Sequence, residues 1–131
     1  IDLKNHLLYE RILPSALGLE RYNSSQSDSL QDTYGHGTHV AGIILGLNPQ
    51  ARILPLKVTS GHEQDDYSFD AYLAALRFAI EQKVDVINIS LSGEETSKEE
   101  RVLLKKAQEK GILVVTSAGN EGKELNSTHH S

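Results

Sequence analysis

The feature that most constrains the fold of this chain is an alternation of two patterns between residues 52 and 117. Short apolar runs rich in β-branched and aliphatic residues alternate with amphipathic segments of helical periodicity. The runs cover residues 52–58, 84–91 and 112–117, and the helical segments cover residues 68–82 and 97–110. Strands joined through helices lie parallel and carry helices on both faces of their sheet. We therefore expect an α/β fold with a three-layer arrangement around a parallel sheet.

Local signals mark the ends of the two helical segments. Ser68 is the expected N-cap of the first segment, and Ser97 forms a capping box with Glu100 at the start of the second. Gly111 follows the second segment, where a left-handed backbone is expected. Pro55 cannot donate to a strand ladder, so we expect a bulge or an interrupted edge in the first apolar run.

A second feature precedes the alternation, the stretch TYGHGTHVAGIILG at residues 33–46. From Thr38 the stretch is apolar on most sides, which predicts a buried helix. The preceding residues 23–35 are polar and rich in serine and are expected to form an exposed loop, in which Asp28 and Asp32 would be solvated charges. Residues 1–22 have a short helical spacing of leucines and isoleucine.

Three kinds of site could use this glycine and histidine stretch. A phosphate cradle would need a third glycine where Val40 stands and an apolar strand before the motif, and both are absent. A metal site would pair His36 with His39 and would need a further ligand, but there is no HExxH pattern. A hydrolase would use a histidine at a helix start, because that position favours the neutral imidazole a general base needs.

Charge and composition narrow the partners. The chain of 131 residues has 13 Lys and Arg against 18 Asp and Glu, a formal charge of -5, and no basic run. We therefore expect no nucleic-acid partner. No apolar stretch approaches the roughly 20 residues that span a bilayer, so we expect no membrane association. The sequence has no cysteine, which excludes disulfides and a thiol nucleophile but does not identify a compartment.

Three ordered motifs resemble those of the subtilisin-like serine proteases. They are GHGTHVAG at residues 35–42, VDVINISLSG at residues 84–93 and VVTSAGNEG at residues 114–122. The intervening residues 47–58 resemble the family segment between the histidine helix and the next strand, so the likeness covers about residues 32–122. The resemblance implies a subtilisin-like fold, with residues 1–131 as a partial peptidase domain truncated at both ends.

The resemblance also implies roles for individual residues. His36, the first histidine of the motif, would be the general base of a Ser-His-Asp triad, and His39 would be a packed structural histidine. Asn120 would donate a hydrogen bond to the oxyanion. The substrate cleft and the primary specificity pocket would be lined by Ser90, Leu91, Ser92, Ser117, Ala118 and Gly119, although family members usually have glycine where this chain has Ser92.

Two departures from the family pattern bear on activity. The nucleophile stands in a GTS-M-A-x-P motif that residues 1–131 do not contain, so we expect this chain to be inactive alone. Asp2 is the candidate triad aspartate, but its context DLKN also resembles the later HPDL segment, and both assignments remain open. The loop after the histidine helix is only LNPQA, too short for the family's calcium loop, so we predict no calcium, no other metal and no cofactor.

The sequence thus predicts a serine endopeptidase by family, with peptides or proteins as substrates. A partner could be the remaining segment of its own peptidase domain. The alternative is a catalytically inactive fragment or a homologue that binds peptides along residues 90–93 without cleaving them. Members of the family are mostly secreted, with intracellular examples, and the sequence does not choose between them.

Overall fold

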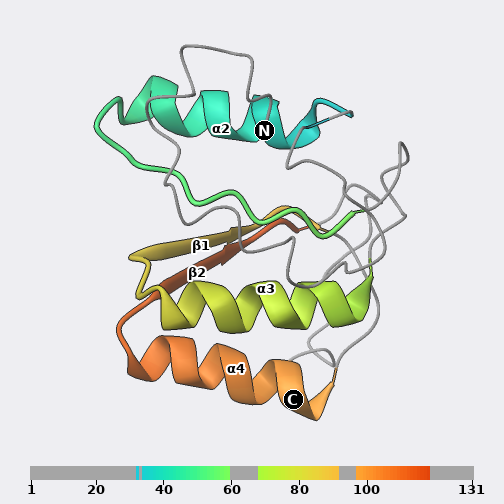
Figure 1. Cartoon of the computed structure of the whole chain (residues 1–131). Helices are drawn as coiled ribbons and strands as arrows, with labels where there is room; N and C mark the ends of the chain where they lie inside the picture. The colour runs from blue at the N-terminus through green and yellow to red at the C-terminus, as the bar shows by residue number, and fades with distance from the viewer. Residues whose placement is uncertain (1–31, 33, 60–67, 92–96, 119–131) are drawn as a thin grey trace. The chain divides into compact units, whose positions relative to one another are not determined.

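The computed structural model describes Asp32 and residues 34–59, 68–91 and 97–118 (Figure 1). The chain divides into two compact units, Ile1–Phe78 and Ala79–Ser131, which are considered separately below. The described elements are α2 (His36–Leu47), α3 (Phe69–Glu81), β1 (Val86–Ile89), α4 (Lys98–Glu109) and β2 (Leu113–Thr116). The expected helix in residues 1–22 lies outside the described residues. The observed order confirms a mixed α/β chain with parallel strands.

The strand expected at residues 52–58 is not formed. Within this segment and the residue after it, only isolated bridge positions occur, at Ile53 and Thr59. Pro55 is buried in the middle of the segment and has no N–H to contribute to a ladder. The apolar pattern therefore predicted the burial of this segment correctly in part but not a continuous strand, because a strand also needs donors along its whole length.

Helix α3 forms where its periodicity predicts it. The Ser68 hydroxyl accepts a hydrogen bond of 3.3 Å from the Ala71 amide, which confirms the expected N-cap. Leu73, Leu76 and Ile80 of the predicted apolar stripe are buried, and the rings of Phe69 and Tyr72 have centroids 5.8 Å apart. The stripe thus identified the buried side of α3 from the sequence alone.

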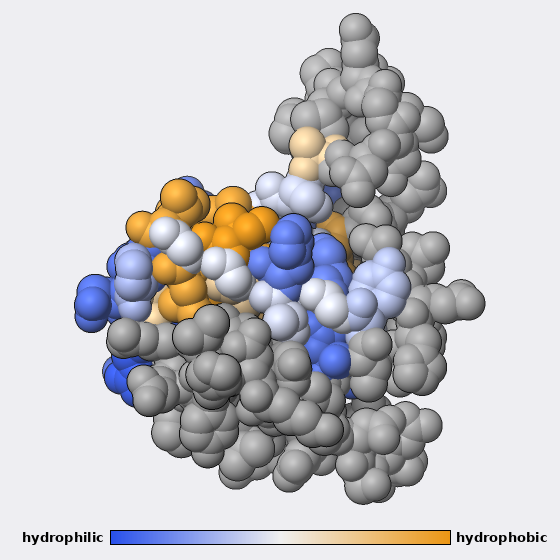
Figure 2. Space-filling model, turned by 90° about the horizontal axis from the view of Figure 1, so that it is seen from above, coloured by the Kyte–Doolittle hydropathy of each residue, from blue (hydrophilic) through white to orange (hydrophobic). Residues whose placement is uncertain are grey.

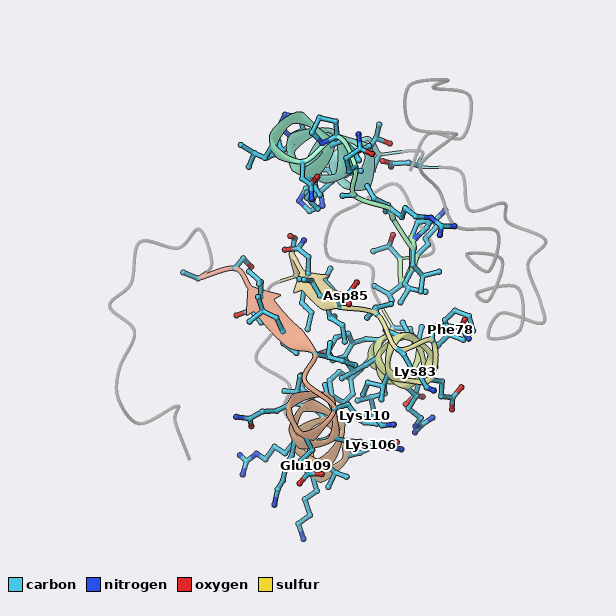
Figure 3. All side chains as sticks on the ribbon, turned by 90° about the vertical axis from the view of Figure 1, so that its left-hand side faces the viewer. Phe78, Lys83, Asp85, Lys106, Glu109 and Lys110 are labelled. Atoms are coloured by element: carbon cyan, nitrogen blue, oxygen red, sulfur yellow. The ribbon has the colours of Figure 1, made fainter. Side chains whose placement is uncertain are left out.

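Helix α4 also begins as predicted. The Ser97 side chain accepts from the Glu100 amide at 3.0 Å, which satisfies one of the amides that the first helical turn leaves without a partner. Leu103 and Ala107 are its buried residues, and α4 packs against β2 in the second unit. In Figure 3 its long charged side chains extend away from the strands.

Both α3 and α4 end in the same hydrogen-bonded turn. After α4, the Gly111 amide donates to Gln108 O and the Ile112 amide to Ala107 O, each at 3.0 Å. After α3, the Lys83 amide donates to Ile80 O at 3.1 Å and the Val84 amide to Ala79 O at 3.4 Å. These pairs define Schellman motifs, which need a left-handed residue just past the helix. Gly111 has φ 74° as predicted, whereas Lys83 occupies the same position with φ 54° and no sequence signal for it.

These two positions should respond to substitution with opposite signs. Gly111→Ala forces a Cβ into left-handed backbone and should lower the free energy of unfolding by about 1 to 2 kcal/mol. Lys83→Gly removes a Cβ from the same conformation and should raise that free energy by up to a similar amount, about 1 kcal/mol, less the added entropy of the unfolded chain. Urea denaturation of both variants tests this, and two changes of the same sign would contradict the shared motif.

The second unit contains a parallel pair of strands. Val86 of β1 pairs with Leu113 of β2, and the register continues to Ile89 with Thr116. Its core consists of Ala79, Ile80, Ile87, Leu103, Ala107 and Ile112. The expectation that helices cover both faces is wrong for the described strands, because Val86, Leu113 and Val115 on one face are 52%, 60% and 43% exposed. Crossover connections fix the parallel direction but do not by themselves supply a layer for each face.

Helix α2 is confirmed, and it begins at His36, two residues before the predicted start. The prediction that it is buried is wrong, since Ala41 is its single buried residue while Ile43 and Leu47 are 54% and 86% exposed. Figure 2 views the molecule from the α2 side of Figure 1 and shows hydrophobic atoms gathered at the surface there. An apolar sequence indicates which surface a helix can bury, but burial needs a neighbour.

Candidate active site

The N-terminus of α2 is built by a carboxylate outside the helix. Gly35 is the N-cap residue, with φ 96° and ψ -14°, and it has no side chain to cap the helix. Its carbonyl accepts the first helical hydrogen bond from the His39 amide at 3.0 Å. The capping side chain is instead Asp32, whose Oδ2 accepts from the Thr38 amide at 2.8 Å and from the Thr38 hydroxyl at 2.7 Å. The carboxylate therefore occupies the place of an ordinary N-cap side chain.

The second oxygen of Asp32 holds the loop before the helix. Asp32 Oδ1 accepts from the Tyr34 amide at 3.0 Å and from the Gly35 amide at 2.6 Å. Each oxygen thus has two donors, and the carboxylate joins the loop to the first turn. The expectation that Asp32 is a solvated charge is wrong. Sequence reasoning missed this residue because an N-cap is normally sought next to the helix, although an acid four residues before His36, with Gly at the cap, was a usable signal.

These contacts determine the ionisation of Asp32. Partial desolvation raises the pKa of Asp32, but the hydrogen bonds from the Thr38 side chain, Gly35 and the Thr38 amide together lower the pKa well below its usual range. Because the folded pKa lies below the unfolded value, the stability these bonds contribute is fully present above the unfolded pKa. It is lost only as the pH falls through the folded value, in strong acid.

The two histidines of the motif differ in their exposure. His36 is the first residue of α2 and is half-buried, whereas His39, one turn later, is exposed. The expectation that His39 is packed is therefore wrong in this structure. Among the described residues, no group of three or more His, Asp and Glu side chains could hold a metal ion. The first unit thus presents His36 at the start of a helix whose entry is fixed by Asp32.

The second unit brings together residues that follow the two parallel strands. Ser90 and Leu91 follow β1, and Ser117 and Ala118 follow β2. The Ser117 amide donates to Ile89 O at 3.2 Å, and the Ser117 hydroxyl donates to Leu91 O at 3.4 Å. The Asn88 side-chain amide donates to Ser90 Oγ at 2.9 Å. The carboxyl ends of parallel strands are where α/β sheets place their ligands, so these residues form the second half of the candidate site.

Several predicted site residues lie outside the described part of the chain. They are Ser92, Gly119, Asn120 and Asp2. The described members of the site are His36 in the first unit, and Ser90, Leu91, Ser117 and Ala118 in the second. Within the described ranges, no helix has the length and apolar character that a bilayer crossing requires.

Comparison with known proteins gives a consistent result. The whole chain, residues 1–131, matches the model of the subtilase family. It is 35% identical to the major intracellular serine protease of Bacillus subtilis (strain 168), over 92% of this chain and 39% of that protein. It is 42% identical to an intracellular serine protease of Paenibacillus polymyxa, over 70% of this chain and 30% of that protein. It is 36% identical to subtilisin E of Bacillus subtilis (strain 168), over 75% of this chain and 28% of that protein. The chain thus spans well under half the length of these curated relatives.

Proposed function

Because the chain belongs to the subtilase family, we propose that it forms part of a serine endopeptidase and supplies the general base, His36, and the oxyanion donor, Asn120. Its substrates are peptides or proteins. The proposal treats residues 1–131 as a partial peptidase domain that acts together with a segment bearing the nucleophilic serine.

One observation supports the assignment of His36 above all. His36 opens α2, and the backbone on both sides of it is bound to a single carboxylate, through Gly35 before it and Thr38 after it. A general base must be held within hydrogen-bonding reach of the proton it removes, so a fixed backbone at this residue suits the role. His39 lacks this feature, because it lies a full turn further on and is exposed.

The proposed reaction follows from these roles. The serine hydroxyl attacks the peptide carbonyl while an imidazole nitrogen of His36 accepts its proton, and the imidazolium then donates this proton to the leaving amine. The Asn120 side-chain amide donates a hydrogen bond to the oxygen that becomes negatively charged in the tetrahedral intermediate. Water completes the cycle by hydrolysing the acyl-enzyme. Asp2 is the candidate acid to orient His36.

The residues after the strands would bind the substrate. An extended peptide can pair with a strand edge through main-chain hydrogen bonds. Ser90 and Leu91 continue from β1, and the bond from the Ser117 hydroxyl to Leu91 O ties this segment to the end of β2. This tie supports a defined substrate edge, with Ser117, Ala118 and Gly119 next to the substrate side chain and Ser92 at the rim.

Reconstitution tests the proposal. Residues 1–131 alone should neither hydrolyse a peptide substrate nor react with a serine-directed fluorophosphonate. The same chain joined to the segment encoded next to it that carries a GTS motif should do both. If the encoding DNA on both sides holds neither that motif nor a strand ending in Asp-Thr-Gly or Asp-Ser-Gly, the chain is an inactive or peptide-binding homologue and the peptidase assignment fails.

A further inference from the structure

We propose that Asp32 is a positioning residue for the candidate base, holding the loop and the first turn of α2 so that His36 is presented in one orientation. This inference rests on the proposed function of His36. It assigns to Asp32 no contact with the substrate and no part in proton transfer.

The first step concerns the helix start itself. The first amides of an α-helix have no partner within the helix and need a side chain or another acceptor. Gly35 at the N-cap offers no side chain, and its φ of 96° is a conformation that other residues rarely adopt. Such a start would be loose unless another group held it. Asp32 Oδ2 holds it by accepting from the Thr38 amide, the position that an N-cap side chain ordinarily serves.

The second step concerns the division of labour between the two oxygens. Oδ1 accepts only from the loop, at Tyr34 and Gly35, and Oδ2 accepts only from the helix, at Thr38. His36 lies between the two bound segments in the chain. Rotation of the loop against the helix would break bonds on one oxygen or the other, so the carboxylate restrains the backbone on both sides of His36.

The third step separates positioning from direct participation. Four donors approach the two oxygens of Asp32 at 2.6 to 3.0 Å, and the ring of His36 is not among them. The low pKa of Asp32 agrees with a carboxylate that stays ionised and accepts these bonds throughout the neutral range. Asp32 therefore acts on His36 through the backbone.

The variant Asp32→Asn separates the carboxylate from its shape. Asparagine offers one acceptor oxygen and one amide nitrogen, so the two donors at one position lose their acceptor. In the reconstituted peptidase we expect kcat to fall about 10- to 100-fold with KM little changed, because a small displacement of a catalytic group can cost about 100-fold. Asp70→Asn is the matched control, since Asp70 also lies in the first turn of a helix, α3, and its replacement should leave kcat unchanged.

Thr38 supplies a second, milder pair of variants. Thr38→Val keeps the β-branched shape but removes the hydroxyl that donates to Asp32, and it should lower kcat in the same direction. Thr38→Ser keeps the hydroxyl and should retain most of the activity. Loss of activity in both variants, or in neither, would overturn a role for this hydrogen bond.

Amide hydrogen exchange gives a readout that does not depend on activity. In the wild-type chain the amides of Tyr34, Gly35 and Thr38 should be protected, and Asp32→Asn should speed their exchange at least about tenfold, the loss expected from roughly 1.4 kcal/mol of hydrogen bonding. Amides of residues 44–47, late in α2, should change little. Absence of protection in the wild type, or equal acceleration along all of α2, would overturn the proposal.

The two proposals can fail separately. If His36→Ala leaves turnover intact, the base assignment fails, and with it any positioning of that base. If His36→Ala abolishes turnover while Asp32→Asn has wild-type kcat, the base assignment stands and only the role of Asp32 is wrong.

Discussion

Replacing His36 with Ala in the reconstituted peptidase should abolish measurable turnover. Without the imidazole no group in the proposed site takes the proton from the attacking serine or returns it to the leaving amine. A positioned group of this kind contributes about 100- to 10,000-fold by general acid–base catalysis. The loss should appear in kcat and in kcat/KM alike, because the proton moves only in the transition state. Steady-state kinetics on a chromogenic peptide measures both constants.

His39→Ala is the matched control for this experiment. The two histidines belong to the same motif and the same helix, but His39 is exposed and has no assigned part in the chemistry. Its replacement should leave kcat close to the wild-type value, and any effect should appear as a change in thermal stability. If His39→Ala abolished turnover and His36→Ala did not, the base would be the other histidine.

The second large effect is expected at Asn120. Asn120→Ala should lower kcat about 100- to 1000-fold with KM nearly unchanged, because the lost hydrogen bond forms with the oxyanion and not with the ground-state carbonyl. This range is the general value for one such donor and includes an enzyme of this same family, so its size is carried over. Asn120→Asp should be nearly as inactive, since a carboxylate repels the developing charge.

Asn48→Ala is a suitable control for Asn120. Asn48 follows α2, and its side-chain oxygen accepts from the Gln50 amide at 3.1 Å, so its replacement affects only a local turn. It should reduce stability slightly and leave kcat unchanged. A fall in KM or kcat for Asn48→Ala equal to that for Asn120→Ala would mean that the kinetic loss reports unfolding and not the oxyanion.

Much of the local structure could be predicted from the sequence because it depends on neighbours in the chain. The Ser68 and Ser97 caps, the left-handed Gly111 and the apolar stripe of α3 all involve contacts within a few residues. Lys83 shows the limit of this reasoning. It adopts the same left-handed turn as Gly111, but a lysine carries no signal for it, because the turn is enforced by the end of α3 and the apolar residues around it.

The candidate site divides in the same way. The motif alone identified His36 and the segments after the strands, because family motifs are patterns of sequence. The role of Asp32 could not be assigned this way, since it depends on a loop folding back so that one carboxylate meets amides two, three and six residues away. The contact of Ser117 with Leu91, 26 residues apart, likewise needed the parallel register of β1 and β2.

The sequence by itself determined the family, the order of helices and strands, and the base, because these follow from motifs and from periodicity along the chain. Only the tertiary structure decided which apolar surfaces are buried and which acid is bound. It left Ile43, Leu47 and one face of the β1–β2 pair exposed, and it reduced the run around Pro55 to isolated bridges. The physical reason is that hydrophobicity and charge are properties of a residue, whereas burial and hydrogen bonding are properties of a residue together with its partner in space.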